Sequence, residues 1–521
     1  MSEIKIQTSS ELEFSKIYKI EDFDNVIKNF DLVHSLMSLQ RLSVLMGNQI
    51  AVNVNIEFEF YATPKIKRRA GMLTRDFVSF ATKRVLLNCS KQERQYNDLD
   101  LANLINIYGN LEDGLQTLET ESEMVEQGWS WLLRSTNYQW HYLRFYSSLI
   151  ARYFWIFDRV VKENKELGGK IDTALGMNLF EVMKIGTCIY ANFCPREDGV
   201  FADSFLIESY TETTYEELKP LLSTQNIQNF LNIFSISTTQ FITESKKFEL
   251  SDVFLKKYEF NSLKRFPVIK TDSTKQNEQY IIPSQPDFVY GIFEGLYYII
   301  LEKLEKVDGS ALLQEMGKVF ELYVEEMIKQ YNLDLLNRAV LAQETTYKIG
   351  KKEWRSADHL LISDEYIFQI ECKKRKIDAY SKVGIQKESG VGIESLFTDI
   401  ANELDKLSQK EKHIIENKVP GIEYKNQKII NIIVYLDEMF TINRFARNKI
   451  KEKMKTQTNN FYIMGCWEFE SVCQQSKNKQ QGLLFSIQDL IANKIKIYQI
   501  DHLDRIYQDF FSSIMKDTSS I

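Results

Sequence analysis

The chain has 521 residues, of which 44% are hydrophobic and 26% are charged, and its formal net charge is -7. At roughly 100–200 residues per domain, this length predicts two to four folded units. No run approaches the roughly 18 apolar residues of a membrane span, and the first residues lack the apolar core of a signal peptide. We therefore expect a cytoplasmic protein without a membrane partner.

The cysteines and histidines favour a reducing compartment and argue against a zinc site. The six cysteines are scattered, form no CxxC pair and lie mostly in apolar stretches. This distribution is typical of free thiols in a reducing compartment. The five histidines do not cluster, as the ligands of a zinc ion would.

The positive charge is bunched in the second half of the chain. Residues 1–290 contain 32 basic and 38 acidic residues, whereas residues 291–521 contain 33 and 34. Binding of nucleic acid depends on a local positive patch more than on net charge, so two basic runs are candidate phosphate contacts. A solvated surface explains either run alone equally well. The residues that we single out are Lys374, Arg375, Lys376, Arg444, Arg447 and Lys449.

The first 262 residues are expected to be mainly helical with a few strands. Helices are predicted where apolar residues recur at helical spacing, over residues 22–46, 98–118, 129–161 and 174–193, with two or three more between 215 and 263. The alternating sequence VNVNIEFEFY predicts a half-buried strand from Val52. Aromatic residues within 129–161 are mixed with Leu and Ile, so we expect them in a core, although such a stripe can also stack on bases.

A domain boundary is expected between residues 262 and 287, where prolines interrupt the helical pattern. Helices are predicted next over residues 288–306 and 311–331, and the segment Asp308-Gly309-Ser310 is expected to cap the second. The apolar stripe of that second helix is predicted to comprise Leu313, Met316, Phe320, Val324 and Met327.

Gly317 and Glu321 lie at the edge of the same stripe, four residues apart. A glycine there allows another part of the backbone to approach the helix. Glu321 is then able to lean from the helix toward whatever lies beneath it.

The second half of the chain is expected to form a mixed sheet between helices. Strands are predicted at 343–349, after Asp358, up to Lys373, from Lys428 and, as an edge strand, at FYIMGCWEF from Phe461. A polar loop over 380–392 and a helix over 393–417 separate the third of these from the fourth. The order helix, three strands, helix and strand predicts an α/β domain.

Two acidic residues and a lysine are expected to converge in this sheet. Glu371 and Lys373 face one side of their strand and Cys372 faces the other, because side chains alternate along a strand. The short connection over 363–365 predicts that the flanking strands pair, which brings Asp358 close to Glu371. Such a group suits a divalent cation such as magnesium beside a polarised water. A turn carboxylate and an exposed cross-strand ion pair are the simpler explanations.

These residues resemble the PD-(D/E)XK nucleases, which share the restriction-endonuclease-like fold. Asp358 begins one strand, the tripeptide Glu371-Cys372-Lys373 ends the next, and Glu321 lies on the preceding helix, as in that family. The resemblance covers roughly residues 265–475 and looks most like restriction-associated and Mrr-like bacterial nucleases with a long N-terminal extension. Ala357 replaces the name-giving proline, a position that is commonly degenerate in the family and does not bind metal.

The resemblance implies a magnesium-dependent endonuclease, with manganese as a substitute, that hydrolyses DNA rather than RNA in bacterial defence against foreign or phage DNA. The implied metal ligands are Asp358, Glu371, the backbone carbonyl of Cys372, and Glu321. Lys373 would orient and help deprotonate the attacking water. Glu325 lies one turn from Glu321 and is the alternative for that role.

The implied organisation has three parts: a mainly helical region over 1–262, a nuclease domain over 263–480 and a helical extension over 481–521. The first part is a candidate for sensing a protein trigger or binding a partner subunit or DNA. Restriction-like nucleases often act as dimers, so a homo-oligomer is considered as well. The alternative function is a catalytically silent nuclease fold that binds nucleic acid or serves as a scaffold in a defence or repair complex.

Overall fold

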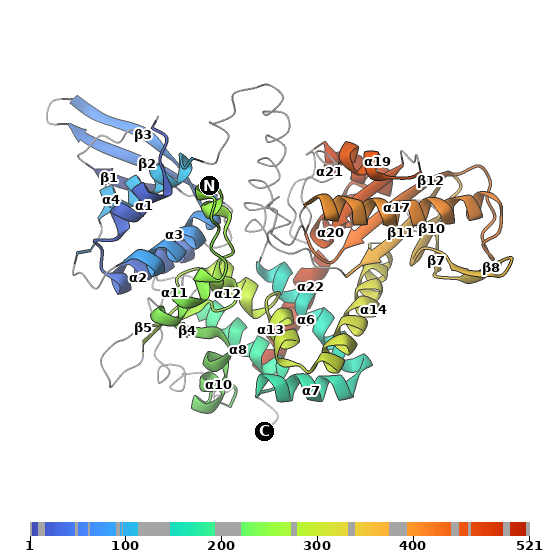
Figure 1. The fold of residues 1–521 in the computed structure, drawn as a ribbon, viewed down its shortest axis with the longest axis horizontal. Helices are drawn as coiled ribbons and strands as arrows, with labels where there is room; N and C mark the ends of the chain where they lie inside the picture. Colours follow the sequence, from blue (N-terminus) through green and yellow to red (C-terminus); the bar gives the residue numbers. More distant parts are fainter. Residues whose placement is uncertain are drawn as a thin grey trace.

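The structure is a computed structural model of the chain (Figure 1). It describes residues 3–8, 16–46, 51–60, 63–89, 94–95, 97–112, 146–192, 220–271, 279–331, 339–374, 393–438, 447–456, 460–492 and 501–516. Helices dominate the N-terminal region and the largest sheet lies in the C-terminal half, so the predicted mixed α/β class is confirmed. Within these residues no helix is long and apolar enough to cross a membrane.

The chain begins with strands and helices that share a small core. They are β1 (Glu3–Thr8), α1 (Ile20–Ile27), α2 (Leu32–Met46), β2 (Ala51–Phe60), β3 (Thr63–Thr74), α3 (Arg75–Asn88) and α4 (Asp98–Gly109). The strand predicted from Val52 is β2, which pairs with β1 in parallel and with β3 antiparallel. The helix predicted over 22–46 is divided into α1 and α2, because the Asp31 carboxylate accepts the His34 backbone N–H at 2.6 Å and starts a new helix.

The next elements are α6 (Tyr146–Glu163), α7 (Lys165–Leu175), α8 (Leu179–Asn192), α10 (Thr224–Phe234), β4 (Ser235–Ser237), α11 (Thr238–Lys246), the 3-10 helices η3 (Val253–Tyr258) and η4 (Ser262–Lys264), β5 (Val268–Thr271) and β6 (Gln279–Ile281). The helix predicted from residue 174 starts later, at Leu179, because Gly176 ends α7 in a left-handed conformation with φ 75°. Of the helix predicted over 129–161, residues 129–145 lie outside the described part. Within α6, Tyr153 and Phe157 are buried, as expected for a core stripe.

The C-terminal half contains α12 (Gln285–Ile292), α13 (Leu296–Lys303), α14 (Lys306–Gln330), β7 (Val340–Gln343), β8 (Thr346–Ile349), β9 (Lys352–Arg355), β10 (His359–Ile362), β11 (Tyr366–Lys373), α17 (Ile393–Ile415), β12 (Lys428–Tyr435), α19 (Arg447–Lys453), β13 (Phe461–Gly465), α20 (Cys466–Lys479), α21 (Leu483–Ile491) and α22 (Asp501–Lys516). A five-stranded sheet has the order β13-β12-β11-β10-β7. Its β11, β12 and β13 run parallel, while β10 is antiparallel to both neighbours. The mixed sheet and the edge position of β13 were both predicted.

Several predicted boundaries in this half are wrong for local reasons. The segment Asp308-Gly309-Ser310 lies inside α14 and is no cap, because α14 already begins at Lys306. The strand predicted to continue to Phe469 ends at Gly465, because the Glu468 carboxylate accepts the Gly465 backbone N–H at 3.0 Å and starts α20.

Two further predictions in this half need correction. The helix predicted over 288–306 is divided into α12 and α13, and the strand over 343–349 into β7 and β8. The stripe of α14 buries Leu312 in place of Leu313, which is 39% exposed. Met316, Phe320, Val324 and Met327 are buried, as predicted.

The five-stranded sheet is covered by helices on both faces (Figure 1). On one face, Ile367 and Ile433 pack with residues of α17. On the other face, Phe368 and Ile432 pack with α14, α20 and the N-terminal helix α6. The same core includes α7, α8 and α22, so it crosses the predicted boundaries at residues 262 and 480. One hydrophobic core therefore contains residues from all three predicted parts, 1–262, 263–480 and 481–521. The division of the chain into these parts stays a prediction.

Candidate active site

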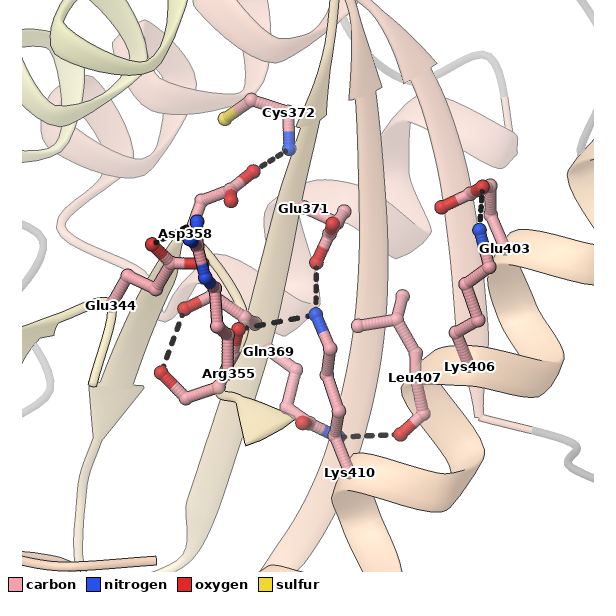
Figure 2. Close-up of polar contacts among 12 residues, drawn as sticks. Glu344, Arg355, Asp358, Gln369, Glu371, Cys372, Glu403, Lys406, Leu407 and Lys410 are labelled. Carbon is pink, nitrogen blue, oxygen red and sulfur yellow. Dashed lines mark hydrogen bonds and ion pairs between the residues drawn. The ribbon is translucent and has the colours of Figure 1, made fainter. Parts of the chain in front are cut away.

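The two predicted acidic residues meet at one end of the β10–β11 pair. His359 lies opposite Ile370 in the antiparallel register, so the preceding Asp358 and the following Glu371 are the next residues at this end. The backbone N–H of Cys372 donates to Asp358 Oδ2 at 2.6 Å (Figure 2). The Cys372 side chain belongs to the core on the α14 face, opposite to Glu371, as the alternation predicted. The approach of Asp358 to Glu371 is thus confirmed as a structural prediction.

The Glu371 carboxylate is held by two lysines from different elements. Lys373 Nζ lies 2.9 Å from Oε1, and Lys410 Nζ lies 2.8 Å from Oε2. Figure 2 shows Lys410 reaching from α17 to Glu371. Lys410 Nζ also donates to the backbone carbonyl of Ser356 at 3.1 Å, two residues before Asp358. Lys410 therefore joins α17 to both strands of the site.

The helix α17 also supplies a third carboxylate. Glu403 Oε2 lies 2.9 Å from Lys373 Nζ, and Glu403 Oε1 lies 2.7 Å from Lys406 Nζ. Neither Glu403 nor Lys410 was predicted as a site residue. The only sequence signal was their spacing of seven residues, which places both on one face of a helix.

A buried amide pair fixes the strands beneath these charges. Gln369 Nε2 donates to Asn431 Oδ1 on β12 at 2.8 Å and to the carbonyl of Leu407 on α17 at 3.4 Å. Asn431 Nδ2 in turn donates to Glu411 Oε2 at 3.1 Å. Because Gln369 and Asn431 are fully buried, these bonds constrain β11, β12 and α17 to one register.

The site concentrates negative charge in a partly buried place. Burial, followed by the neighbouring Glu371 and Glu321, raises the pKa of Asp358 to about 7, while the Cys372 N–H acts in the opposite direction. The pKa of Glu321 is also raised, first by burial and then by Glu344 and Glu371. Burial lowers the pKa of Lys373, but Glu371 and Glu403 outweigh burial and raise it. A further cation near these carboxylates would relieve their repulsion.

Glu321, rather than Glu325, belongs to this charged group. The Glu321 backbone carbonyl accepts His359 Nε2–H at 3.0 Å, which ties α14 to β10. Its carboxylate interacts with Glu371 and Lys373. Glu325 instead forms an ion pair with Lys329 along α14. The placement of the two side chains thus distinguishes them where the sequence did not.

The donor set fits a hard divalent cation of the magnesium type. Asp358 and Glu371 offer carboxylate oxygens, and magnesium commonly takes one or two carboxylates and keeps several waters. The pKa of Asp358 is raised first by burial and then by the like charge of Glu371 and Glu321, and a bound cation would neutralise that like charge. Among the residues that the structure describes, no three His, Cys, Asp or Glu side chains form a group that could hold a metal ion by themselves. Water and substrate would have to complete any coordination.

The predicted phosphate contacts are only partly placed. Arg375, Lys376 and Arg444 lie outside the described residues. The Lys374 ammonium donates to the Leu313 backbone carbonyl. A Cβ at Gly317 would lie 3.2 Å from Lys374 Cδ, so the glycine admits this side chain and not another backbone.

On α19, the predicted phosphate contact Arg447 is engaged with β13. Its guanidinium stacks on Phe461 at 4.3 Å, and its Nη1 donates to the Phe461 carbonyl at 2.6 Å. Burial lowers the pKa of Arg447. Lys449, on the same helix, is half-buried. Lys374 and Arg447 therefore hold elements together, which leaves less of their charge for a polyanion.

The comparisons with known proteins give no relative. No protein-family model matches the chain, and no curated protein and no solved structure matches it. The interpretation of the site therefore depends on its residues and their geometry.

Proposed function

We propose that this chain is a magnesium-dependent endonuclease of the PD-(D/E)XK type that hydrolyses phosphodiester bonds in DNA. The observation that carries the proposal is the meeting of Asp358 with Glu371 and Lys373 at the ends of neighbouring strands, fixed by the Cys372 N–H bond of 2.6 Å. Acidic groups with a lysine beside them suit hydrolysis by an activated water.

Each residue has a proposed role. Asp358 and Glu371, with the Cys372 carbonyl and Glu321, would hold magnesium or manganese, which lowers the pKa of a water and offsets charge on the phosphate when bound. Lys373 orients the attacking water and stabilises negative charge in the transition state. Glu403 and Lys410 hold Lys373 and Glu371 in place, since each bonds one of them within 3 Å.

The biological setting is part of the same proposal. DNA is favoured over RNA, and a role in cytoplasmic defence against foreign DNA is favoured, by the resemblance to restriction-associated nucleases. A sensing or partner-binding role is proposed for residues 1–262. Because α6 shares a core with the sheet, that role has to be examined in the full chain.

The test is cleavage of plasmid DNA by the purified full chain with magnesium or manganese. Asp358→Asn and Lys373→Met should each lower the rate by about 10²–10⁴-fold, because each removes a group that acts on the reacting water or its metal. The matched control is Lys425→Met, since Lys425 is 63% exposed on the same half of the chain. Circular dichroism should show that all three variants are folded.

Two outcomes would decide against this function. Equal cleavage by Asp358→Asn, Lys373→Met and the wild type would mean that another protein or site cuts the DNA. No cleavage of any DNA by the wild type, with DNA binding retained, would favour the catalytically silent binding or scaffold protein.

A further inference from the structure

A basic β-hairpin comes just before Asp358 in the chain. Residues 346–355 form β8 and β9, which pair with each other in a two-stranded sheet. They contain four basic residues and one acidic residue in a chain of net charge -7, namely Lys348, Lys351, Lys352, Arg355 and Glu353. All five are exposed. Figure 1 shows this hairpin at the outer end of the sheet domain, beyond α17.

The hairpin has a defined turn. Ile349 lies opposite Lys352, so the turn contains two residues, Gly350 and Lys351. Gly350 has φ 61°, which glycine adopts without strain, as two-residue hairpin turns require at their first position. This turn places the Lys351 ammonium at the tip with no described element covering it.

One face of the hairpin is anchored to α17. Tyr347 and Trp354 are cross-strand neighbours, and both pack edge-on against His413 in the last turn of α17, with ring centroids 5.7 Å and 4.5 Å away. The Tyr347 hydroxyl is also 2.9 Å from His413 Nδ1. The hairpin is therefore packed against α17, and the backbone that carries its basic side chains is held in place.

The base of the hairpin is tied to the acidic site. The Ser356 backbone N–H donates to the Thr345 carbonyl at 3.0 Å, and the Thr345 N–H donates to Ser356 Oγ at 2.9 Å. The Ser356 carbonyl accepts Lys410 Nζ–H, and the same ammonium binds Glu371. Arg355 is only three residues from Asp358. These bonds fix the position of the hairpin relative to Asp358 and Glu371, so a ligand bound to the hairpin would also have a fixed position relative to these carboxylates.

The outer face and tip of the hairpin carry most of its positive charge. Lys348 follows Tyr347 and Arg355 follows Trp354, so both point away from the aromatic anchors, because successive residues of a strand point to opposite faces. The acidic neighbours are Glu353, opposite Lys348, and Glu344, which is 3.6 Å from Arg355. Lys352 lies over the Trp354 ring at 3.9 Å. The basic side chains outnumber these two acidic neighbours, so the hairpin has a net positive charge that is exposed to solvent.

We propose that the β8–β9 hairpin binds backbone phosphates of double-stranded DNA, and so positions a duplex next to Asp358 and Glu371. The choice of DNA as the polyanion rests on the proposed nuclease function. Lysine and arginine ammonium and guanidinium groups attract phosphates without regard to base sequence. Lys348 and Lys351 are the main contacts, because neither forms a described ion pair that competes with a phosphate.

The experiment measures binding of the full chain to a fluorescent DNA duplex by anisotropy at several salt concentrations, with EDTA present to prevent cleavage. The hairpin variant is Lys348→Gln with Lys351→Gln. The matched control is Lys303→Gln with Lys306→Gln, an equal charge change at exposed positions on α13 and α14. The hairpin variant should bind about tenfold more weakly and reduce the salt slope by about 1–2, whereas the control should leave both unchanged.

Two duplexes of unrelated sequence should give the same loss, because phosphates carry no sequence information. An RNA duplex of equal length separates the two sources of phosphate. A loss on DNA supports the proposal, and a loss confined to RNA overturns it. Equal DNA binding by the hairpin variant and the control also overturns it, as would follow if the hairpin served a protein partner.

These outcomes are separate from those of the nuclease test. If the wild type cleaves DNA with magnesium but the hairpin variant binds as the control does, only the hairpin proposal fails. If the hairpin variant loses affinity and salt slope but the wild type cleaves no DNA, the hairpin site stands and the nuclease function fails.

Discussion

Two charged clusters lie at the ends of β11, β12 and β13, and they differ in solvent access. The first is the acidic site, where Asp358 and Glu371 lie at a partly open end of the sheet. The second is sealed in the core: Arg152 of α6 pairs with Glu470 of α20 at 2.6 Å and with Glu438 after β12 at 3.1 Å. All three side chains of this second cluster are at most 2% exposed.

The sealed cluster satisfies its own charges. Arg152 also bonds Glu470 through Nε at 2.7 Å, and the Tyr323 hydroxyl donates to the same carboxylate at 2.7 Å. The Trp467 backbone N–H donates to Glu438 at 3.2 Å. Each buried charge thus has fixed partners, which is the condition under which a buried ion pair is tolerated. The cluster joins the N-terminal helix α6 to the sheet domain.

In the acidic site, lysines pair with Glu371 and Glu403, whereas Asp358 accepts the Cys372 backbone N–H. Burial and the neighbouring carboxylates hold the pKa of Asp358 at about 7. Carboxyls whose pKa is raised in this way are enriched at functional sites. The two clusters therefore differ in their access to solvent, and the more accessible acidic site is the candidate for chemistry. Substitutions at three positions of these clusters test this difference.

The largest effect is expected from Arg152→Met, which leaves Glu438 and Glu470 buried without their cation. The free energy of unfolding should fall by about 3–5 kcal/mol, because a buried charge without its partner is strongly destabilising. Urea unfolding followed by circular dichroism measures this change. Lys162→Met on the same helix is the control, since Lys162 is 65% exposed. A loss below about 1 kcal/mol would contradict a structural role for the sealed cluster.

A smaller effect is expected when the two glutamates of α14 are compared. Glu321→Gln should lower the cleavage rate by about 10–100-fold, because Glu321 interacts with Glu371 at the site. Glu325→Gln is the matched control, one helical turn away and paired with Lys329. It should change the rate less than threefold, an effect below about 0.7 kcal/mol. The reverse ranking would assign the role to Glu325 and would refute our placement of the site.

The smallest effect concerns pH. The carboxyl of Asp358 has an ordinary pKa of 3.8 and a pKa of about 7 in the folded chain. Between these values the folded state holds a proton that the unfolded state has released, so Asp358 makes the protein less stable as pH rises from about 4 to about 7. Above that window both states are ionised and the penalty is constant.

Asp358→Asn removes this titration. In EDTA, the variant should gain stability over the wild type as pH rises from 5 to 8, by about 1–2 kcal/mol, because partial exposure screens the full shift. Urea unfolding at four pH values checks the sign. If the free energies of unfolding of the two proteins changed in parallel with pH, the pKa of Asp358 would not be raised in the folded chain.

Part of the site was predictable because it depends on local geometry. Because side chains alternate along β11, Glu371 and Lys373 point to the face opposite to Cys372. The short turn between β10 and β11 brings Asp358 next to Glu371. The remaining partners were not predictable in this way. Lys410 is 39 residues from Glu371, and Glu403 meets Lys373 only because α17 crosses β11.

The amino-acid sequence alone predicted the mixed sheet of the C-terminal half, its edge strand β13 and the face on which Glu371 and Lys373 lie. Hydrophobic periodicity acts over a few residues, and these features are local. Only the tertiary structure decided that Arg152 joins the two halves, that Lys374 and Arg447 are engaged with neighbouring elements, and that the basic hairpin is tied to the acidic site. These contacts link residues far apart in the chain, and packing of whole elements, rather than local pattern, brings them together.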